Sequence, residues 1–538
     1  MMREFADATT ARALGLTTLW RRLERVTPFA RDIRPRFFPP GEAKQLEAQW
    51  KQVEQAVEKL ESGPGSFASL RHRLAQVKDI RPSVERAVRG FTLDVVELFE
   101  IKSFLGSLRD IRGHATAGLW PGSKDMVPPD PARLAQVLDP QGKNEASFHL
   151  DAGFSPALGR LEVLKKRLKG RLDQEKQRLS GQVEAELGVP LGLGGELVLP
   201  REDVKLERAW QLPQLVLERE TSSHLFFKVR STPAALIWEE RYTRLREWEE
   251  RIEEKVRQRL SQAVASEASA LGEAVDCLRR LDLLLATAIL CREWRGVRPR
   301  LNGDRLELVE GRHPLVEEEV CSRGYAYSPI SLTMEAGVTV ITGPNMGGKT
   351  QTLRTVGLMV ALAQHGFLVP ASSFAFPPRS FLFYGAGQAC EETGLSAFAQ
   401  EIEGIKGLLS RRHQPGLALV DEFARSTNPK EGRALAGALA ALLGESDVFT
   451  LLVTHFDGLG QSSRFRQYQV RGLRAREVPA LGGVDSLHRC MDYRLERVEP
   501  GAPVPHYALE DGRLLGLDEE LLTRARAFLR EEEATCRW

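Results

Sequence analysis

The chain has 538 residues, of which 42% are hydrophobic and 28% are charged, and this composition is typical of a soluble globular protein of about three or four domains. No stretch reaches the apolar length of a membrane span, the N-terminus has no secretory hydrophobic region, and the six cysteines are scattered without a metal-binding or disulfide pattern. We therefore expect a cytoplasmic protein with no membrane contact. The net charge of +2 gives no sign of nucleic acid, so any such surface has to be a local patch.

Residues 1–157 are predicted to form the first part of a helical core or lever. Lys44–Glu61 consists of strong helix formers and places apolar side chains on one face. Thr92–Leu108 is a second candidate helix. Five prolines between Pro121 and Pro140 predict a loop.

Residues 158–240 are predicted to form a clamp-like insertion. The stretch 158–179 carries eight basic residues against three acids, with leucines at helical spacing. It is either a solvated helix face or a stripe that binds phosphates. Short β-like runs follow at Glu196–Leu199, Leu215–Leu217 and Leu225–Val229, and they predict a small β-rich element.

Residues 241–300 contain no proline before Pro299, and apolar residues recur there at three- and four-residue steps with a gap near Glu267. This pattern predicts one long helix or a pair of helices. Its predicted role is a rigid lever that joins the insertion to the C-terminal domain, and an ordinary bundle helix is the alternative. Residues 301–538 alternate strands with helices, which predicts an α/β domain with a mostly parallel sheet covered by helices.

The centre of that domain is a short β-branched strand, a glycine-rich turn and a helix. The turn, Gly343–Thr350, has the pattern G-x-x-x-x-G-K-T, in which curled backbone N–H groups and a helix N-terminus hold phosphates. Lys349 is expected to reach the β- and γ-phosphates, and Thr350 to supply a hydroxyl to Mg²⁺. The predicted nucleotide-binding residues of this segment are Gly343, Pro344, Asn345, Met346, Gly347, Gly348, Lys349, Thr350 and Gln351.

Acidic residues follow a buried apolar strand downstream, at Asp421 and Glu422. We predict that Asp421 holds Mg²⁺ through water or Thr350, and that Glu422 is the base that orients the attacking water. Another strand ends at His455, which can contact the γ-phosphate. Ser396 begins a candidate helix and could bind a γ-phosphate, although in isolation it would be only an N-cap.

Taken together, these motifs resemble the MutS family of DNA mismatch-repair ATPases, a branch of the ABC-type P-loop ATPases. The resemblance is carried by TGPNMGGKT at 342–350, GRHPLVE at 311–317, SAFAQE at 396–401, DEFARST at 421–427 and TH at 454–455. It implies an ATPase with ATP and Mg²⁺ that switches a lever and clamp, paired as a homodimer or with a second MutS-like subunit. By that resemblance Ser396 would face the nucleotide of the other subunit, and Tyr327 would lie near the adenine.

The sequence also departs from the family. The stretch before the lever is too short for mismatch-reading and connector domains, so we expect a short form. Ala424 and Ser426 replace two glycines of the family's acidic motif. Two targets of the clamp therefore remain as alternatives. One is DNA that is bound without reading mismatches, and the other is a protein. If the target is a protein, the chain resembles short MutS-like proteins such as the ATPase subunit that reactivates B12-dependent lysine 5,6-aminomutase. An inactive interaction protein is disfavoured, because Lys349, Thr350, Asp421, Glu422 and His455 are all present.

Overall fold

The computed structural model describes residues 5–116, 126–130, 132–142, 148–192, 195–344, 347–386, 397–425, 427–456, 465–473, 491–499, 509, 512–513 and 515–535. Three predicted site residues, Asn345, Met346 and Ser396, lie outside them. The chain divides into two compact units. Unit 1 comprises Met1–Ala75, Gly113–Val127 and Cys277–Trp538, and unit 2 comprises Gln76–Arg112 and Pro128–Asp276.

Unit 1 contains a six-stranded sheet in the order β13-β12-β7-β11-β10-β9. The pairs from β12 to β9 are all parallel, and β13 adds an antiparallel edge. The sheet confirms the predicted α/β domain with a mostly parallel sheet. Its strands are β7 (Gly337–Thr342), β9 (Phe381–Ala386), β10 (Gly416–Asp421), β11 (Phe449–Val453), β12 (Arg466–Leu473) and β13 (Met491–Val498).

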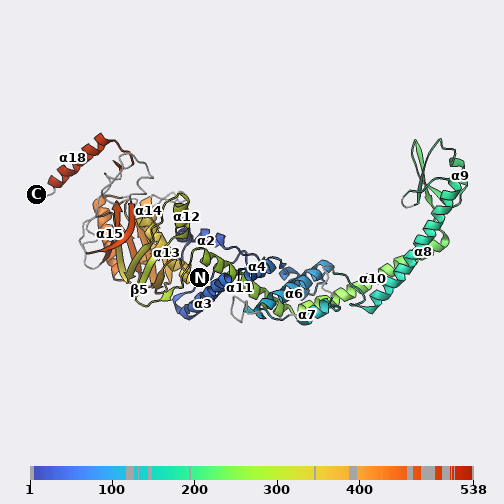
Figure 1. Ribbon diagram of the computed structural model, residues 1–538, viewed down its shortest axis with the longest axis horizontal. Helices are drawn as coiled ribbons and strands as arrows, with labels where there is room; N and C mark the ends of the chain where they lie inside the picture. The colour runs from blue at the N-terminus through green and yellow to red at the C-terminus, as the bar shows by residue number, and fades with distance from the viewer. Residues whose placement is uncertain are drawn as a thin grey trace. The chain divides into compact units, whose positions relative to one another are not determined.

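The two faces of this sheet are covered by different helices, which are labelled around its strands in Figure 1. Ile341 and Leu419 pack in one core with side chains of α13 (Lys349–Gln364). Val340 and Val420, one residue away along the same strands, pack in another core with α14 (Ala397–Leu409) and α15 (Pro429–Gly444). Because side chains alternate across a strand, every residue of β7 and β10 is buried.

A second sheet of unit 1 has the order β4-β8-β5-β6 and mixes parallel and antiparallel pairs. Its strands are β4 (Arg300–Leu301), β5 (Arg305–Gly311), β6 (Ile330–Glu335) and β8 (Ser373–Phe376). The remaining helices that lie entirely in unit 1 are α1 (Ala8–Ala13), α2 (Leu16–Arg22), η1 (Pro40–Glu42), α3 (Ala43–Ser62), α4 (Pro64–Ala75), α12 (Pro314–Ser322) and α18 (Glu519–Thr535).

Unit 2 is mainly helical, and it carries a three-stranded antiparallel sheet in the order β1-β3-β2. The strands are β1 (Glu196–Pro200), β2 (Leu215–Glu220) and β3 (His224–Val229), at the places where the sequence predicts β-like runs. The helices are α5 (Arg81–Val88), α7 (Ala132–Leu138), α8 (Pro156–Leu187), α9 (Leu206–Gln211) and α10 (Pro233–Ser266), while α6 (Val95–Thr116) and α11 (Ala268–Glu293) have residues in both units.

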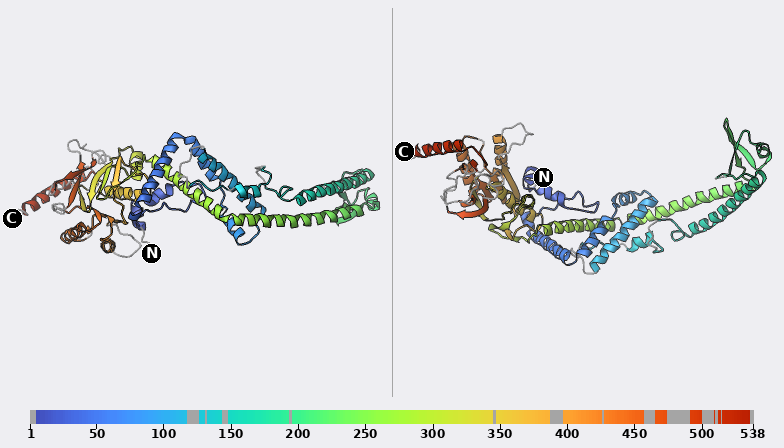
Figure 2. Two further views of the ribbon diagram at one scale, coloured as in Figure 1. Left: turned by 90° about the horizontal axis from the view of Figure 1, so that it is seen from below. Right: turned by 45° about the horizontal axis from the view of Figure 1, so that its top comes forward.

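Helices α8 and α10 lie side by side in every view of Figures 1 and 2, and the small sheet follows the end of α8. Each helix begins with a proline in its first turn, where the missing N–H costs no hydrogen bond. Two ion pairs link the helices, Lys165 with Glu249, and Lys176 with Glu239 at 3.3 Å.

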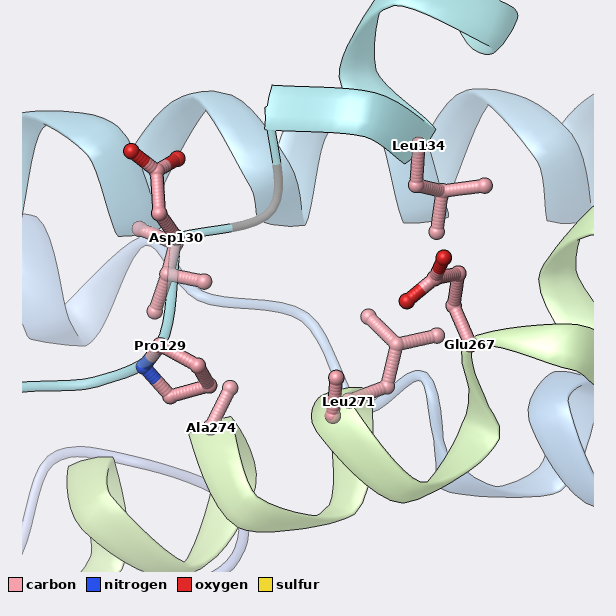
Figure 3. Close-up of a pocket in the computed structure, with 8 residues that line it drawn as sticks. Pro129, Asp130, Leu134, Glu267, Leu271 and Ala274 are labelled. Atoms are coloured by element: carbon pink, nitrogen blue, oxygen red, sulfur yellow. The ribbon is translucent and has the colours of Figure 1, made fainter.

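The predicted lever is a pair of helices that is interrupted at one residue, Glu267, which has φ −102° and ψ 11°. The interruption falls at the gap in the apolar pattern. Figure 3 shows Leu271 and Ala274 of α11 pointing toward Pro129 and Leu134 across a small pocket beside this break. In the part of the chain that the structure describes, none of the helices is long and apolar enough to cross a membrane.

Candidate functional site

The phosphate-loop motif lies between the central strand β7 and helix α13. Gly343 has φ +135° and Gly348 has φ +80°, backbone conformations that favour glycine. A Cβ on Gly343 would stand 3.2 Å from the backbone N and O of Val470 in β12, so the loop is pressed against the next strand. A Cβ on Gly348 would stand 3.3 Å from the ring of Tyr493 in β13. Both positions therefore favour glycine by backbone conformation, and an added Cβ would also crowd the neighbouring strands.

Lys349 lies within this loop. Its side chain is buried, and Nζ donates hydrogen bonds to the carbonyl oxygens of Gly343 at 2.8 Å and Pro344 at 2.9 Å. The ammonium group is thus held at the N-terminus of α13, where the helix dipole adds further positive potential. This combination suits a phosphate group.

Asp421 ends strand β10 and is buried beside Thr350 and Tyr384. Its Oδ2 accepts a hydrogen bond from the Tyr384 hydroxyl at 3.2 Å, whereas its Oδ1 is buried without a hydrogen-bond partner. Burial raises the pKa of the Asp421 carboxyl, and a hydrogen bond with Thr350 opposes that shift.

These atoms fit Mg²⁺, because the unsatisfied carboxylate oxygen and the Thr350 hydroxyl are hard oxygen ligands. Among the described residues, His, Cys, Asp and Glu side chains form no cluster of three or more that could hold a metal ion. Mg²⁺ commonly takes one or two carboxylates and completes its shell with water and substrate phosphates, so a sparse protein site is what it needs.

Glu422 follows in a tightly held loop. It has φ +53°, and its backbone N–H donates to the carbonyl of Val453 in β11 at 3.1 Å. Its carboxylate pairs with the exposed guanidinium of Arg425 at 2.7 Å. Ala424 has φ +61°, and its N–H donates to Oε2 of Glu401 in α14 at 2.9 Å. Ala424 therefore adopts the left-handed backbone conformation at a position where the motif that this segment resembles has a glycine.

His455 follows strand β11, which lies between β7 and β10. Its side chain is exposed, and its ring centroid is 4.5 Å from that of Phe456. Because the three strands are parallel, the phosphate loop, Asp421 with Glu422, and His455 all follow the carboxyl ends of adjacent strands. Ligands of α/β proteins bind at this edge of the sheet.

Tyr327 bonds to the backbone of His313 and to a side chain of α13, the helix that follows the phosphate loop. Its hydroxyl accepts the backbone N–H of His313 at 2.9 Å and also bonds the Thr355 side chain. Burial raises the pKa of Tyr327. The predicted adenine contact of Tyr327 stays a prediction.

Sequence reasoning missed several neighbours of the site, namely Tyr384, Arg354 and Glu401. Arg354 lies in α13, with its guanidinium 6.0 Å from the centre of the Tyr384 ring. Tyr384 ends up beside Asp421 because β9 pairs with β10 in a register that sets Tyr384 opposite Leu419. The one sequence signal for this neighbour of Asp421 is an aromatic residue near the end of a strand that could pair with β10.

Comparison with known proteins shows which families the chain is similar to. Residues 339–533 match the family model described as MutS domain V. The chain is 29% identical to the endonuclease MutS2 of Pelotomaculum thermopropionicum over 474 residues, which cover 85% of this chain and 56% of the relative. It is 33% identical to the DNA mismatch repair protein MutS of Thermus aquaticus over 280 residues, which cover 52% of this chain and 32% of that protein. The chain thus spans about half the length of the MutS2 relatives that it matches over most of its own length.

Proposed function

Because this chain is homologous to MutS and MutS2 proteins over most of its length, we propose that it is a MutS-type ATPase whose hydrolysis of ATP switches a lever and clamp that act on DNA. The observation that carries the proposal is the common edge of the parallel sheet. There the loop with Lys349, the acids Asp421 and Glu422, and His455 follow adjacent strands.

Each side chain has a defined role in this proposal. Lys349 neutralises charge on the β- and γ-phosphates, and the residues from Gly343 to Gln351 enclose the triphosphate. Thr350 and Asp421 hold Mg²⁺, which when bound offsets the charge that develops on the transferred phosphoryl group. Glu422 orients the water and accepts its proton, and His455 contacts the γ-phosphate.

The proposal includes a dimer, either of two copies or with a second MutS-like subunit. In it Ser396 of one subunit faces the nucleotide of the other, and Tyr327 lies near the adenine. Binding of ATP would favour the closed pair, and hydrolysis would release it. The names of the relatives, DNA mismatch repair protein and endonuclease, support DNA as the target. The basic stretch of α8 gives weaker support, because Lys165, Lys176 and Arg178 already pair with acids in unit 2.

A protein target is the second candidate, and one observation favours it. Leu164 and Trp248 line a groove between α8 and α10 and are 46% and 60% exposed. Exposed apolar side chains of this kind suit a protein surface better than a phosphate backbone. Neither the structure nor the comparisons support a B12-dependent lysine 5,6-aminomutase as that protein.

Steady-state ATPase activity of the full chain tests the proposal, measured alone and with homoduplex, mismatched and four-way-junction DNA at low and moderate salt. We expect Mg²⁺-dependent turnover that Lys349→Ala abolishes together with nucleotide binding. Glu422→Gln should still bind ATP but hydrolyse it slowly. The matched controls are Lys406→Ala and Glu403→Gln, which alter an exposed pair on α14.

The outcomes separate the parts of the proposal. If one DNA form stimulates the ATPase and this stimulation decreases as salt is added, the result supports a nucleic-acid clamp. Binding to phosphates releases counterions from the DNA and therefore weakens as the salt concentration rises. Turnover that is indifferent to all three DNAs contradicts the DNA target and directs attention to a protein. Hydrolysis by Glu422→Gln at the wild-type rate would show that Glu422 is not the base.

A further inference from the structure

A groove in unit 2 runs between α8 and α10, lined by side chains from residues 164–171 and 241–251. We call it the arginine groove. Its apolar members have helical spacing on both sides, with Leu164 and Leu168 four residues apart on α8, and Leu245 and Trp248 three residues apart on α10. Leu164 and Trp248 are largely exposed to solvent. Two adjacent helices thus leave part of their apolar seam uncovered.

The charged members of the groove are strongly unbalanced. Glu247 is the single acid among the lining residues, which also include Arg167, Arg171, Arg241, Arg244 and Arg251. Arg244 pairs with Glu240 at 2.6 Å, but both side chains are more than 60% exposed, so the pair is weak. The other four arginines have no ion pair to an acid within the residues that the structure describes.

Two basic residues of α8 that do not line the groove have, by contrast, an acidic partner on α10. Lys165 and Lys176 each pair with a glutamate of α10, Glu249 and Glu239 respectively. The helix pair therefore compensates positive charge at these two positions and leaves it uncompensated at the groove. An arginine side chain can also cover apolar surface with its methylene stem while its charge stays in water.

We propose that the arginine groove binds an amphipathic α-helix of a partner protein, with an apolar stripe flanked by aspartate or glutamate. A third helix can insert its apolar side chains between the ridges of α8 and α10 and bury Leu164 and Trp248. Acidic residues beside its stripe would meet the unpaired arginines, which form bidentate bonds to carboxylates. This inference concerns unit 2 alone and does not depend on the proposed ATPase.

Duplex DNA fits the same groove less well. Phosphates would satisfy the arginines, but they offer no apolar surface to Trp248 and Leu164, which would stay exposed to water. The apolar half of the groove therefore favours a protein helix. A nucleic acid becomes a distinct outcome of the test.

The probe is a fluorescein-labelled synthetic helix of about 20 residues with leucine on one face and glutamate on both flanks. Two control peptides carry lysine in place of glutamate, or serine in place of leucine. Fluorescence anisotropy is measured on the full chain at moderate salt, alongside a labelled duplex and a labelled oligothymidylate. We expect saturable binding of the acidic leucine peptide, and binding at least roughly tenfold weaker for both control peptides.

Variants locate the binding. Trp248→Ala should weaken the binding of the acidic peptide by roughly tenfold or more, and so should the double variant Arg171→Glu with Arg244→Glu. The matched controls are Trp210→Ala, which truncates another exposed tryptophan of unit 2, and Lys169→Glu, which reverses an exposed charge of α8 outside the groove. Both should bind like the wild type. Circular dichroism verifies folding, and Arg171→Gln with Arg244→Gln replaces the reversal pair if that pair is unfolded.

Two results would overturn the inference. One is an acidic peptide that fails to bind, or that binds the groove variants as well as the controls. The other is tight binding of duplex or oligothymidylate that depends on Arg171 and Arg244 but is unaffected by Trp248→Ala, because that pattern would assign the groove to phosphates.

Discussion

The hydroxyl of Tyr384 donates a hydrogen bond to Oδ2 of Asp421 at 3.2 Å. Both side chains are buried, and burial raises the pKa of each of them. The bond stabilises the charged form of the carboxylate, the form that a divalent cation requires. Tyr384 is therefore expected to keep Asp421 ionised in a site where burial works against ionisation.

Tyr384→Phe should raise the pKa of Asp421 further, because the bond that favours the carboxylate is removed. A hydrogen bond to a charged group contributes about 1.5–3 kcal/mol, so the Mg²⁺ concentration that gives half of the maximal rate of the proposed ATPase should rise roughly tenfold. The acid limb of the pH–rate profile should also move to higher pH. Tyr468→Phe is the control, because its hydroxyl bonds only the backbone of Thr333 in the described structure. An unchanged Mg²⁺ titration in Tyr384→Phe would contradict this role.

Gly432→Ala tests whether the loop that carries Glu422 must keep its position. An added Cβ at Gly432 in α15 would stand 2.6 Å from the carbonyl oxygen of Ala424 and 2.9 Å from the ring of Phe456. The loop has to shift, so we expect a stability loss of about 1–3 kcal/mol and a lower kcat. Denaturant unfolding and steady-state kinetics measure the two effects.

Gly407→Ala is the matched control on helix α14, because the structure places no heavy atom within 4 Å of its added Cβ. It should stabilise the protein by about 0.5–1 kcal/mol, the usual gain of alanine over glycine in a helix, and leave kcat unchanged. Equal behaviour of the two variants would refute the steric argument at Gly432.

The sequence alone predicts the strands and the helix that flank the candidate site residues. A strand, the Gly343–Thr350 loop and a helix are contiguous, so short-range pattern is sufficient to place them. Asp421 and His455 each follow a continuous apolar run, and buried parallel strands have that pattern. The gap near Glu267 likewise predicts the break between α10 and α11.

Contacts between distant segments could not be predicted in the same way. Tyr384 reaches Asp421 only because β9 is the neighbour of β10, and strand order is a property of the whole sheet. The arginine groove combines residues 164–171 with residues 241–251, so it depends on the relative register of α8 and α10. Periodicity predicts each helix and its apolar face, but it does not specify which residues of the second helix lie beside the first.

His313 predicts a pH dependence of stability. Its imidazole is buried, its Nδ1 has no hydrogen-bond partner, and burial lowers its pKa to about 4. In the unfolded chain the same imidazole has a pKa near 6.5, so as the pH falls it is protonated before the imidazole of the folded protein is. The His313 contribution therefore costs no stability above pH 6.5, destabilises the fold progressively as the pH falls from 6.5 to about 4, and changes little below that. Between pH 7 and 4.5 we expect His313 to account for a loss of about 2 kcal/mol.

Comparison with His313→Gln isolates that contribution, because the variant cannot titrate at this position. Its unfolding free energy in urea should fall less between pH 7 and 4.5 than that of the wild type. A parallel fall in the two proteins would mean that other groups cause the acid sensitivity. His224→Gln is the control, because it replaces a more exposed histidine on the small sheet of unit 2.

Asp282 of α11 is 1% exposed and anchors the N-terminal segment of unit 1. Its carboxylate accepts hydrogen bonds from Thr27 N at 2.8 Å, Thr27 Oγ1 at 2.7 Å and Val26 N at 3.2 Å. Asp282→Ala would leave these donors buried without an acceptor, so we expect a loss of about 3 kcal/mol or more in unfolding free energy. Asp282→Asn keeps one acceptor oxygen and should lose clearly less. If alanine and asparagine proved equally destabilising, packing rather than the missing acceptor would explain the loss.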